Sequence, residues 1–241
     1  LGVGTYYLAD GDWSGISASS ISVDGMPHMT GTFTATASGL WLELVKRADS
    51  RIWEATEQSN SWKTYGFGSS LEWTQVKGTA VFDDSAGYTT VNVAAAQDLE
   101  NMIFNAFEKD YTLNAVAYGV TTDNLYQQGG STTTLLGTVT VESKTVVENG
   151  ELVVTSNTTQ TLGTISGEGT LTVDWGQEDA TASGTLNITD IGTLHVKSGV
   201  YTTGDNLEKF AADKVKVGAG ATLAMGANTT MSSAVETAGT I

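Results

Sequence analysis

A glycine followed by an apolar-polar-apolar strand recurs through the second half of this chain. The copies are "GTVTV" at 137, "GELVV" at 150, "GTLTV" at 169, "GTLNI" at 184, "GTLHV" at 192 and "GATLAM" at 220. Each copy predicts a short strand that is entered through a glycine turn. The spacing between copies is irregular, so the loops between the strands are expected to differ in length.

The third and fifth side chains of each copy share one face of the strand, because strand side chains alternate. These pairs are apolar: Val139 and Val141, Leu171 and Val173, Leu186 and Ile188, Leu194 and Val196. A short strand cannot bury an apolar face alone, so the copies must stack on one another. The pattern predicts an all-β fold, a right-handed parallel β-solenoid.

Two segments interrupt the strand pattern. In "AAAQDLENMIFNAFEKD" the apolar residues recur at steps of three and four, which predicts an amphipathic helix over 94–109. The segment "GDNLEKFAAD" predicts a shorter helix over 205–213, with Asp205 or Asn206 as N-cap. Both helices are interpreted as insertions in the solenoid.

The first 75 residues have a different texture. They hold five of the six tryptophans, and the runs "TGTFTATA" (30–37) and "LWLELVKR" (40–47) alternate as strands do. The sequence therefore predicts two parts, a β-rich N-terminal region over 1–75 that caps the solenoid, and the solenoid itself over 76–241. The chain stops on "TAGTI", an echo of "TLGTI" at 161, which predicts that the natural protein continues and that the solenoid is truncated at its C-terminal end.

Charge and composition exclude several classes of function. The formal net charge of −16 would repel phosphate backbones, so no nucleic acid is expected as a partner. The chain has no cysteine, which removes disulfides, zinc-thiolate sites and thiol nucleophiles. No apolar run approaches the roughly 20 residues of a membrane helix, so no direct membrane insertion is expected.

Candidate catalytic groups are few. The two histidines are His28 and His195, and both are interpreted as structural, in a turn and on the outer face of a strand. The carboxylate pairs Asp83/Asp84 and Glu178/Asp179 could cleave a glycosidic bond, but adjacent residues rarely converge, and Asp closes turns. We therefore predict no catalytic residue and no cofactor.

Oxygen-rich loops and aromatic residues are the remaining site candidates. "ADGDWSG", with Asp10 and Asp12, and "TTDN" at 121 lack the full spacing of calcium loops, so turns are favoured over a metal site. "WEATEQSNSWKTYGF" places Trp53, Trp62 and Tyr65 among polar residues, where flat rings either stack on sugars or form the core. These three are the candidate ligand-binding residues, with a core role as the alternative.

A longer stretch resembles a known family. Trp53, Trp62, Gly78 and the run "VFDD" at 81–84, followed by Val91 and Val93, are similar to the opening of bacterial surface proteins with autotransporter-associated β-strand repeats. The later "ISGEGTLTV" resembles the repeat itself, and the helix expected over 94–109 departs from it. The resemblance implies a passenger-type β-solenoid outside the bacterial cell or on its surface, associated with the outer membrane. Such passengers include adhesins, enzymes and inert stalks.

Together these observations predict a non-enzymatic domain that serves adhesion or glycan contact. The expected partner is a host or environmental glycan or protein. The alternatives are a carbohydrate-active β-helix enzyme, a hydrolase or lyase of polysaccharides, and an inert structural stalk.

Overall fold

The computed structural model describes residues 4–15, 20–22, 29–46, 50–56, 77–156, 159–176, 183–184, 186–203, 212–230 and 233–241. The chain divides into two compact units, Leu1–Arg51 and Ile52–Ile241. The described residues form strands and no helix, so the all-β prediction is confirmed for them. The boundary predicted at residue 75 falls outside the described ranges and stays a prediction.

Unit 1 is an antiparallel sheet of four strands in the order β1-β4-β3-β2. The strands are β1 (Gly4–Ala9), β2 (Ser20–Ser22), β3 (Met29–Thr36) and β4 (Gly39–Lys46). β3 and β4 match the two strands expected at 30–37 and 40–47, and they are joined by a tight turn in which the backbone N–H of Gly39 donates to Thr36 Oγ1 at 3.1 Å. The role of this unit as a cap for the solenoid stays a prediction.

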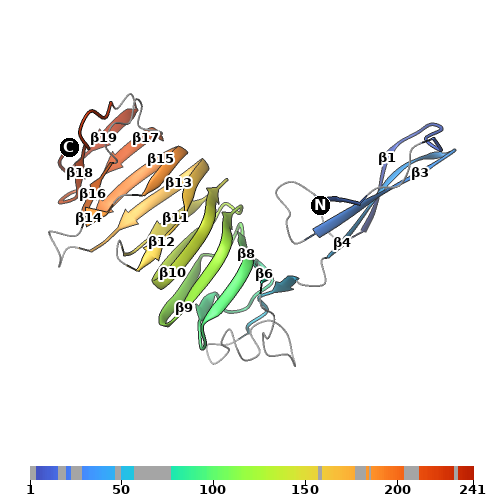
Figure 1. Cartoon of the computed structure of the whole chain (residues 1–241), viewed down its shortest axis with the longest axis horizontal. Coiled ribbons are helices and arrows are strands. Elements are labelled where there is room, and N and C mark those ends of the chain that lie inside the picture. The colour runs from blue at the N-terminus through green and yellow to red at the C-terminus, as the bar shows by residue number, and fades with distance from the viewer. Residues whose placement is uncertain are drawn as a thin grey trace. The chain divides into compact units, whose positions relative to one another are not determined.

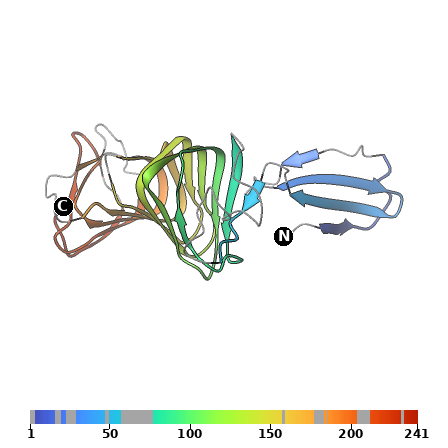
Figure 2. The same cartoon turned by 90° about the horizontal axis from the view of Figure 1, so that it is seen from below.

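Unit 2 is a parallel β-solenoid of about six turns, which runs from green to red in Figure 1. Figure 2 shows its successive coils stacked on one another. Its twelve-stranded and three-stranded sheets are built from β5 (Ser50–Ile52), β6 (Gly78–Asp83), β7 (Thr90–Asn92), β8 (Gln97–Asn105), β9 (Tyr111–Gln127), β10 (Thr132–Val147), β11 (Glu151–Val154), β12 (Gln160–Thr161), β13 (Thr164–Asp174), β14 (Ser183–Gly184), β15 (Asn187–Ser198), β16 (Val200–Thr202), β17 (Ala212–Val217), β18 (Thr222–Ala224) and β19 (Ala234–Thr237).

Apolar side chains at matching positions of successive coils form the core. One column, with each member the strand partner of the next, consists of Val91, Leu113, Leu135, Val154, Val173, Val196 and Val217. All seven are buried, and neighbours in the column are 19 to 23 residues apart in sequence. The predicted inward rows are confirmed, with Leu186 only partly buried. Each coil therefore buries its apolar face against the coils on either side.

A polar ladder crosses the sheet formed by β6, β8, β9, β10, β13 and β15, on the side of the strands away from the apolar column. Its rungs are strand partners, one to a coil: Thr79, Asn101, Asn124, Lys144, Thr164 and Asn187. The Asn124 amide donates to Asn101 Oδ1 at 3.1 Å, and the Asn101 amide donates to Thr79 Oγ1 at 3.1 Å. Stacked amides of this kind satisfy one another's donors and acceptors along the solenoid.

Glycine is required within β10 at a point where two coils approach closely. Gly137 has φ of +79°, and a Cβ placed there would lie 2.4 Å from the carbonyl oxygen of Ala115 in the preceding coil. Only a residue without Cβ adopts this conformation in that space without strain. Gly137, which opens one copy of the repeat, is therefore needed both for its backbone conformation and for the close approach of the preceding coil.

The helix predicted over 94–109 is wrong. Gln97–Asn105 forms β8, whose register against β6 slips by one residue between Leu99 and Asn101. The slip changes which side chains of the strand face inward. Apolar residues are therefore three and four positions apart, as they would be in a helix, although the segment is a strand. Both faces of the strand's second half are covered, because Met102, Ile103 and Phe104 are all buried.

The second predicted helix, over 205–213, falls mostly outside the described residues. Its last two positions, Ala212 and Asp213, are the start of β17 and are therefore strand. The remainder of this prediction is untested.

Candidate functional site

Trp53 belongs to the core of the solenoid. Its side chain has no exposed surface, its indole Nε1 donates to the Tyr88 carbonyl at 2.8 Å, and its ring lies 6.2 Å from that of Phe82. This is the core role that the sequence left open as the alternative to sugar stacking. Trp62 and Tyr65 lie outside the described residues, so their role as ligand-binding residues stays a prediction.

The Asp84 carboxylate holds two coils together, and the Asp83 carboxylate closes a turn within its own coil. Asp84 accepts backbone N–H bonds from Phe107, Glu108 and Lys109 at 2.9 to 3.1 Å. Burial opposes ionisation of Asp84, but these donors and the Lys109 charge outweigh it, so the pKa of Asp84 is lowered. Asp83 accepts from the Ser85 hydroxyl and backbone. Asp83 thus closes the turn that the sequence predicts, Asp84 binds the next coil instead, and Glu178 and Asp179 lie outside the described residues.

His195 lies on the outer face of β15, as the alternation predicts. Its Nδ1 is 3.5 Å from the hydroxyl of Thr172 on β13, and that hydroxyl bonds to the Glu151 carboxylate. Partial burial, followed by the charges of Lys216 and Lys197, lowers the pKa of His195 despite the opposing effect of Glu151. His28 lies outside the described residues.

The loops considered for calcium have their oxygens engaged by the protein. Asp12 Oδ1 accepts from the backbone and hydroxyl of Ser14, which closes an Asx turn. Asp123 Oδ1 binds Lys77 Nζ at 2.6 Å. In the part of the chain that the structure describes, no group of three or more His, Asp or Glu side chains is placed to hold a metal ion.

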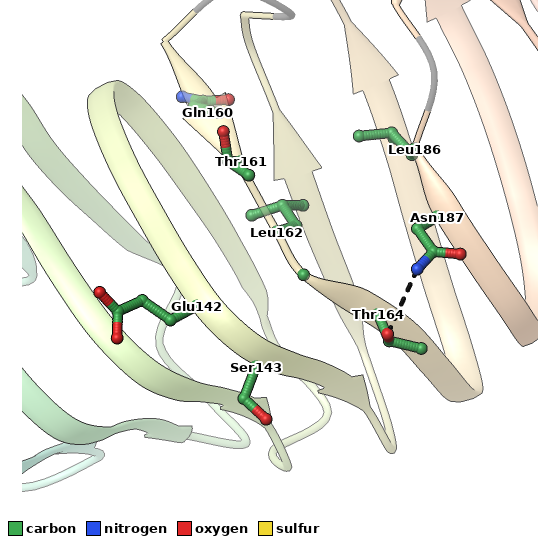
Figure 3. A pocket seen from close by; sticks show the side chains of 9 residues that line it. Glu142, Ser143, Gln160, Thr161, Leu162, Thr164, Leu186 and Asn187 are labelled. Carbon is green, nitrogen blue, oxygen red and sulfur yellow. Dashed lines mark hydrogen bonds between the residues drawn. The ribbon is translucent and has the colours of Figure 1, made fainter.

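An open groove crosses three successive coils of the solenoid. It has a volume of about 460 Å³ and is lined by Glu142, Ser143, Gln160, Thr161, Leu162, Gly163, Thr164, Leu186 and Asn187. Figure 3 shows residues 160–164 in the middle, with Glu142 and Ser143 of β10 on one side and Leu186 and Asn187 on the other. The groove is therefore built from β10, the β12–β13 segment and the start of β15.

Two structural residues shape the floor of this groove. Gln160 is buried, and its amide binds Leu135 O at 2.8 Å while its oxygen accepts the N–H of Thr155 at 2.9 Å. Gly163 has φ of +58°, with Ser143 O only 2.4 Å from where a Cβ would stand. The chain can therefore turn under the groove only with glycine at this position.

The exposed side chains of the groove offer hydrogen bonds of several kinds. Glu142 supplies a carboxylate, Ser143, Thr161 and Thr164 supply hydroxyls, and Asn187 supplies an amide that donates to Thr164 Oγ1 at 3.3 Å. Leu186 adds an apolar wall that is partly exposed. Hydroxyl, amide and carboxylate groups beside an aliphatic wall match the alternating polar edges and apolar faces of a sugar ring.

Sequence reasoning missed this groove. Its residues lie on β10, on the β12–β13 segment and just before β15, and no local motif joins them. The only available signal was the repeat itself, because "GTISG" and "GTLNI" occupy neighbouring coils and bring Thr164 opposite Asn187.

No protein-family model, curated protein or solved structure gives a significant match to this chain. Among the described residues, no helix is both long and apolar enough to span a membrane.

Proposed function

We propose that this chain is a non-enzymatic passenger domain of a bacterial surface or secreted protein, and that its solenoid contacts glycans. The groove at Glu142, Thr161 and Asn187 is the observation that carries the proposal, because its polar groups are exposed and of the kinds that bind sugar hydroxyls. The resemblance of residues 50–241 to surface proteins with β-strand repeats supports the location.

Binding is favoured over cleavage by the chemistry of the groove lining. Glycoside hydrolysis by the usual route needs two carboxyl groups on either side of one bond. Among the described residues that line the groove, Glu142 is the one carboxylate. A single carboxylate beside hydroxyls and an amide is suited to hold a sugar by hydrogen bonds.

The volume of the groove also suits a short stretch of glycan. At about 460 Å³ it falls within the range of small-molecule sites, roughly 300 to 1,000 Å³.

A glycan array with the purified protein tests the proposal, followed by Asn187→Ala and Thr161→Val in the groove. Asn114→Ala is the matched control, because Asn114 also donates an amide hydrogen to a neighbouring coil, at 3.0 Å to Asn92, away from the groove. We expect the groove variants to lose binding and the control to keep it. Absence of binding to every glycan would favour the inert stalk, and release of reducing sugars from polysaccharides would favour the enzyme.

A further inference from the structure

Basic side chains gather on the outer face of two adjacent strands near the C-terminal end of the solenoid. His195 and Lys197 lie on β15, and Lys214 and Lys216 lie on β17; we call these four residues the basic patch. The structure describes six lysines in the solenoid, and three of them are in this patch. Three carboxylates, those of Glu151, Asp174 and Glu236, border these lysines, so the patch is distinguished by its density of lysines and not by a net positive charge.

The strand register brings the four side chains together. His195 is the partner of Lys216, and Thr193 is the partner of Lys214, on parallel strands. The intervening side chains Leu194 and Val215 point into the core and are buried. Because paired strands lie about 4.8 Å apart and alternate residues share a face, the basic groups share one small area of the outer surface.

The lysines of the patch differ in how their charge is balanced. Lys197 Nζ lies 2.7 Å from Asp174 Oδ2, and Lys214 Nζ pairs with Glu236. Lys216 makes no ion pair with any residue that the structure describes. By contrast, Lys77 faces three carboxylates, and Lys109 Nζ donates to two backbone carbonyls at 2.6 Å.

Lys216 stands opposite His195, and the nearby lysine charges contribute to the lowered pKa of the imidazole. Among the residues that the structure describes, no carboxylate forms an ion pair with Lys216, so its ammonium group is available to a negative group from outside.

We propose that the basic patch binds the anionic groups of an acidic polysaccharide, with Lys216 as the principal contact. The ligand class rests on the proposed function, but the site is separate from the groove. Thr170 and Thr193 lie on the same outer face and offer hydroxyls to the uncharged parts of the sugar. The carboxylates of Glu151, Asp174 and Glu236 border the patch, which favours a polymer with spaced negative charges over the dense phosphates of a nucleic acid.

The test compares binding of polygalacturonate, neutral dextran and single-stranded DNA by isothermal titration calorimetry, at low and at physiological ionic strength. The variant is Lys216→Glu, with Lys216→Gln as a milder change if the first disturbs the fold. Lys144→Glu is the matched control, because it makes the same change in net charge at a lysine over the Tyr126 ring on another sheet segment. Circular dichroism and the melting temperature report the fold of each variant.

We expect polygalacturonate to bind more tightly than dextran, and salt to weaken that binding, because exposed charges are screened. Lys216→Glu should weaken the binding of polygalacturonate about tenfold, because reversing the charge replaces one exposed attraction by a repulsion. Lys144→Glu should weaken this binding less than about twofold. Each of four results would overturn the proposal: equal losses of affinity in the two variants, equal binding of dextran, tighter binding of DNA, or no binding of polygalacturonate. Binding of a neutral glycan that Asn187→Ala abolishes and Lys216→Glu leaves intact would support the groove alone.

Discussion

Replacing Leu171 by Ala tests the stacked core of the solenoid at a single rung. Leu171 has no exposed surface, and its strand partners Leu152 and Leu194, in the coils before and after, have none either. The three leucines therefore form a continuous column, and removal of the middle side chain leaves a space with apolar atoms on both sides.

The expected cost follows from the number of buried carbons. Alanine lacks three of the side-chain carbons of leucine, and at about 0.8 kcal/mol each this transfer loss is roughly 2.4 kcal/mol. Backbone ladders on both sides prevent the neighbouring coils from closing the space, so a cavity contribution raises the total to about 3 to 4 kcal/mol, within the measured range for buried leucines.

Urea unfolding of the wild type and Leu171→Ala measures this loss, and hydrogen exchange of the amides in β11, β13 and β15 shows where it falls. Thr170→Ala is the matched control, because Thr170 is the preceding residue on the same strand and faces outward, opposite Glu151 and Thr193. We expect the control to change the free energy of unfolding by less than about 0.5 kcal/mol.

Equal destabilisation by the two substitutions would refute the assignment of inward and outward faces on β13. A loss below about 1 kcal/mol for Leu171→Ala would refute the continuous column, because a site at which neighbours move in to fill the space costs less.

Other substitutions test other contacts. The pKa of Asp84 is lowered in the folded protein, so its stabilising effect is full above the pKa of an unfolded aspartate and is lost as pH falls through the folded value. Asp84→Asn should therefore melt at a lower temperature than wild type at pH 7. The difference in melting temperature should shrink toward pH 3. Trp53→Ala should cost about 3 to 5 kcal/mol in urea unfolding, and a cost under about 1 kcal/mol would contradict its burial. Gly150→Ala should lower the melting temperature, because Gly150 has φ of +64° and a Cβ would lie 2.3 Å from Ser131 O, whereas Gly130→Ala should not, since its nearest neighbour is 3.7 Å away.

The solenoid could be predicted from sequence because its cause is local and repeated. Each copy of the glycine-strand unit carries both the turn and the apolar face. The copies "GTLTV" and "GTLHV" pair in register, with Thr170 opposite Thr193 and Val173 opposite Val196. The prediction of a helix over 94–109 was wrong for a reason that no short stretch of sequence reveals. The register of β8 slips against β6, and the strand is buried on both faces, so its apolar residues lost the alternation that identifies a strand.

The candidate sites were harder to predict than the fold. Turn chemistry predicted a local structural role for Asp84, but its three backbone donors come from residues 107–109, one coil later. The groove and the basic patch have the same origin, because each combines residues about 20 positions apart that meet only through strand register. In the sequence, Lys214 and Lys216 look like ordinary surface charges. Only the pairing of β17 with β15 shows that they lie beside His195.

The parallel register also determines how the solenoid would respond to a pulling force along its axis. Successive coils are joined by strand hydrogen bonds and a shared apolar column, with matching residues 19 to 23 positions apart. Tension applied at the two ends would load the outermost pairing first, so coils would detach one after another and each would release roughly 70 Å of chain. A stack of this kind extends in steps under load, and the coils that remain keep their outer faces intact while neighbouring ones unravel.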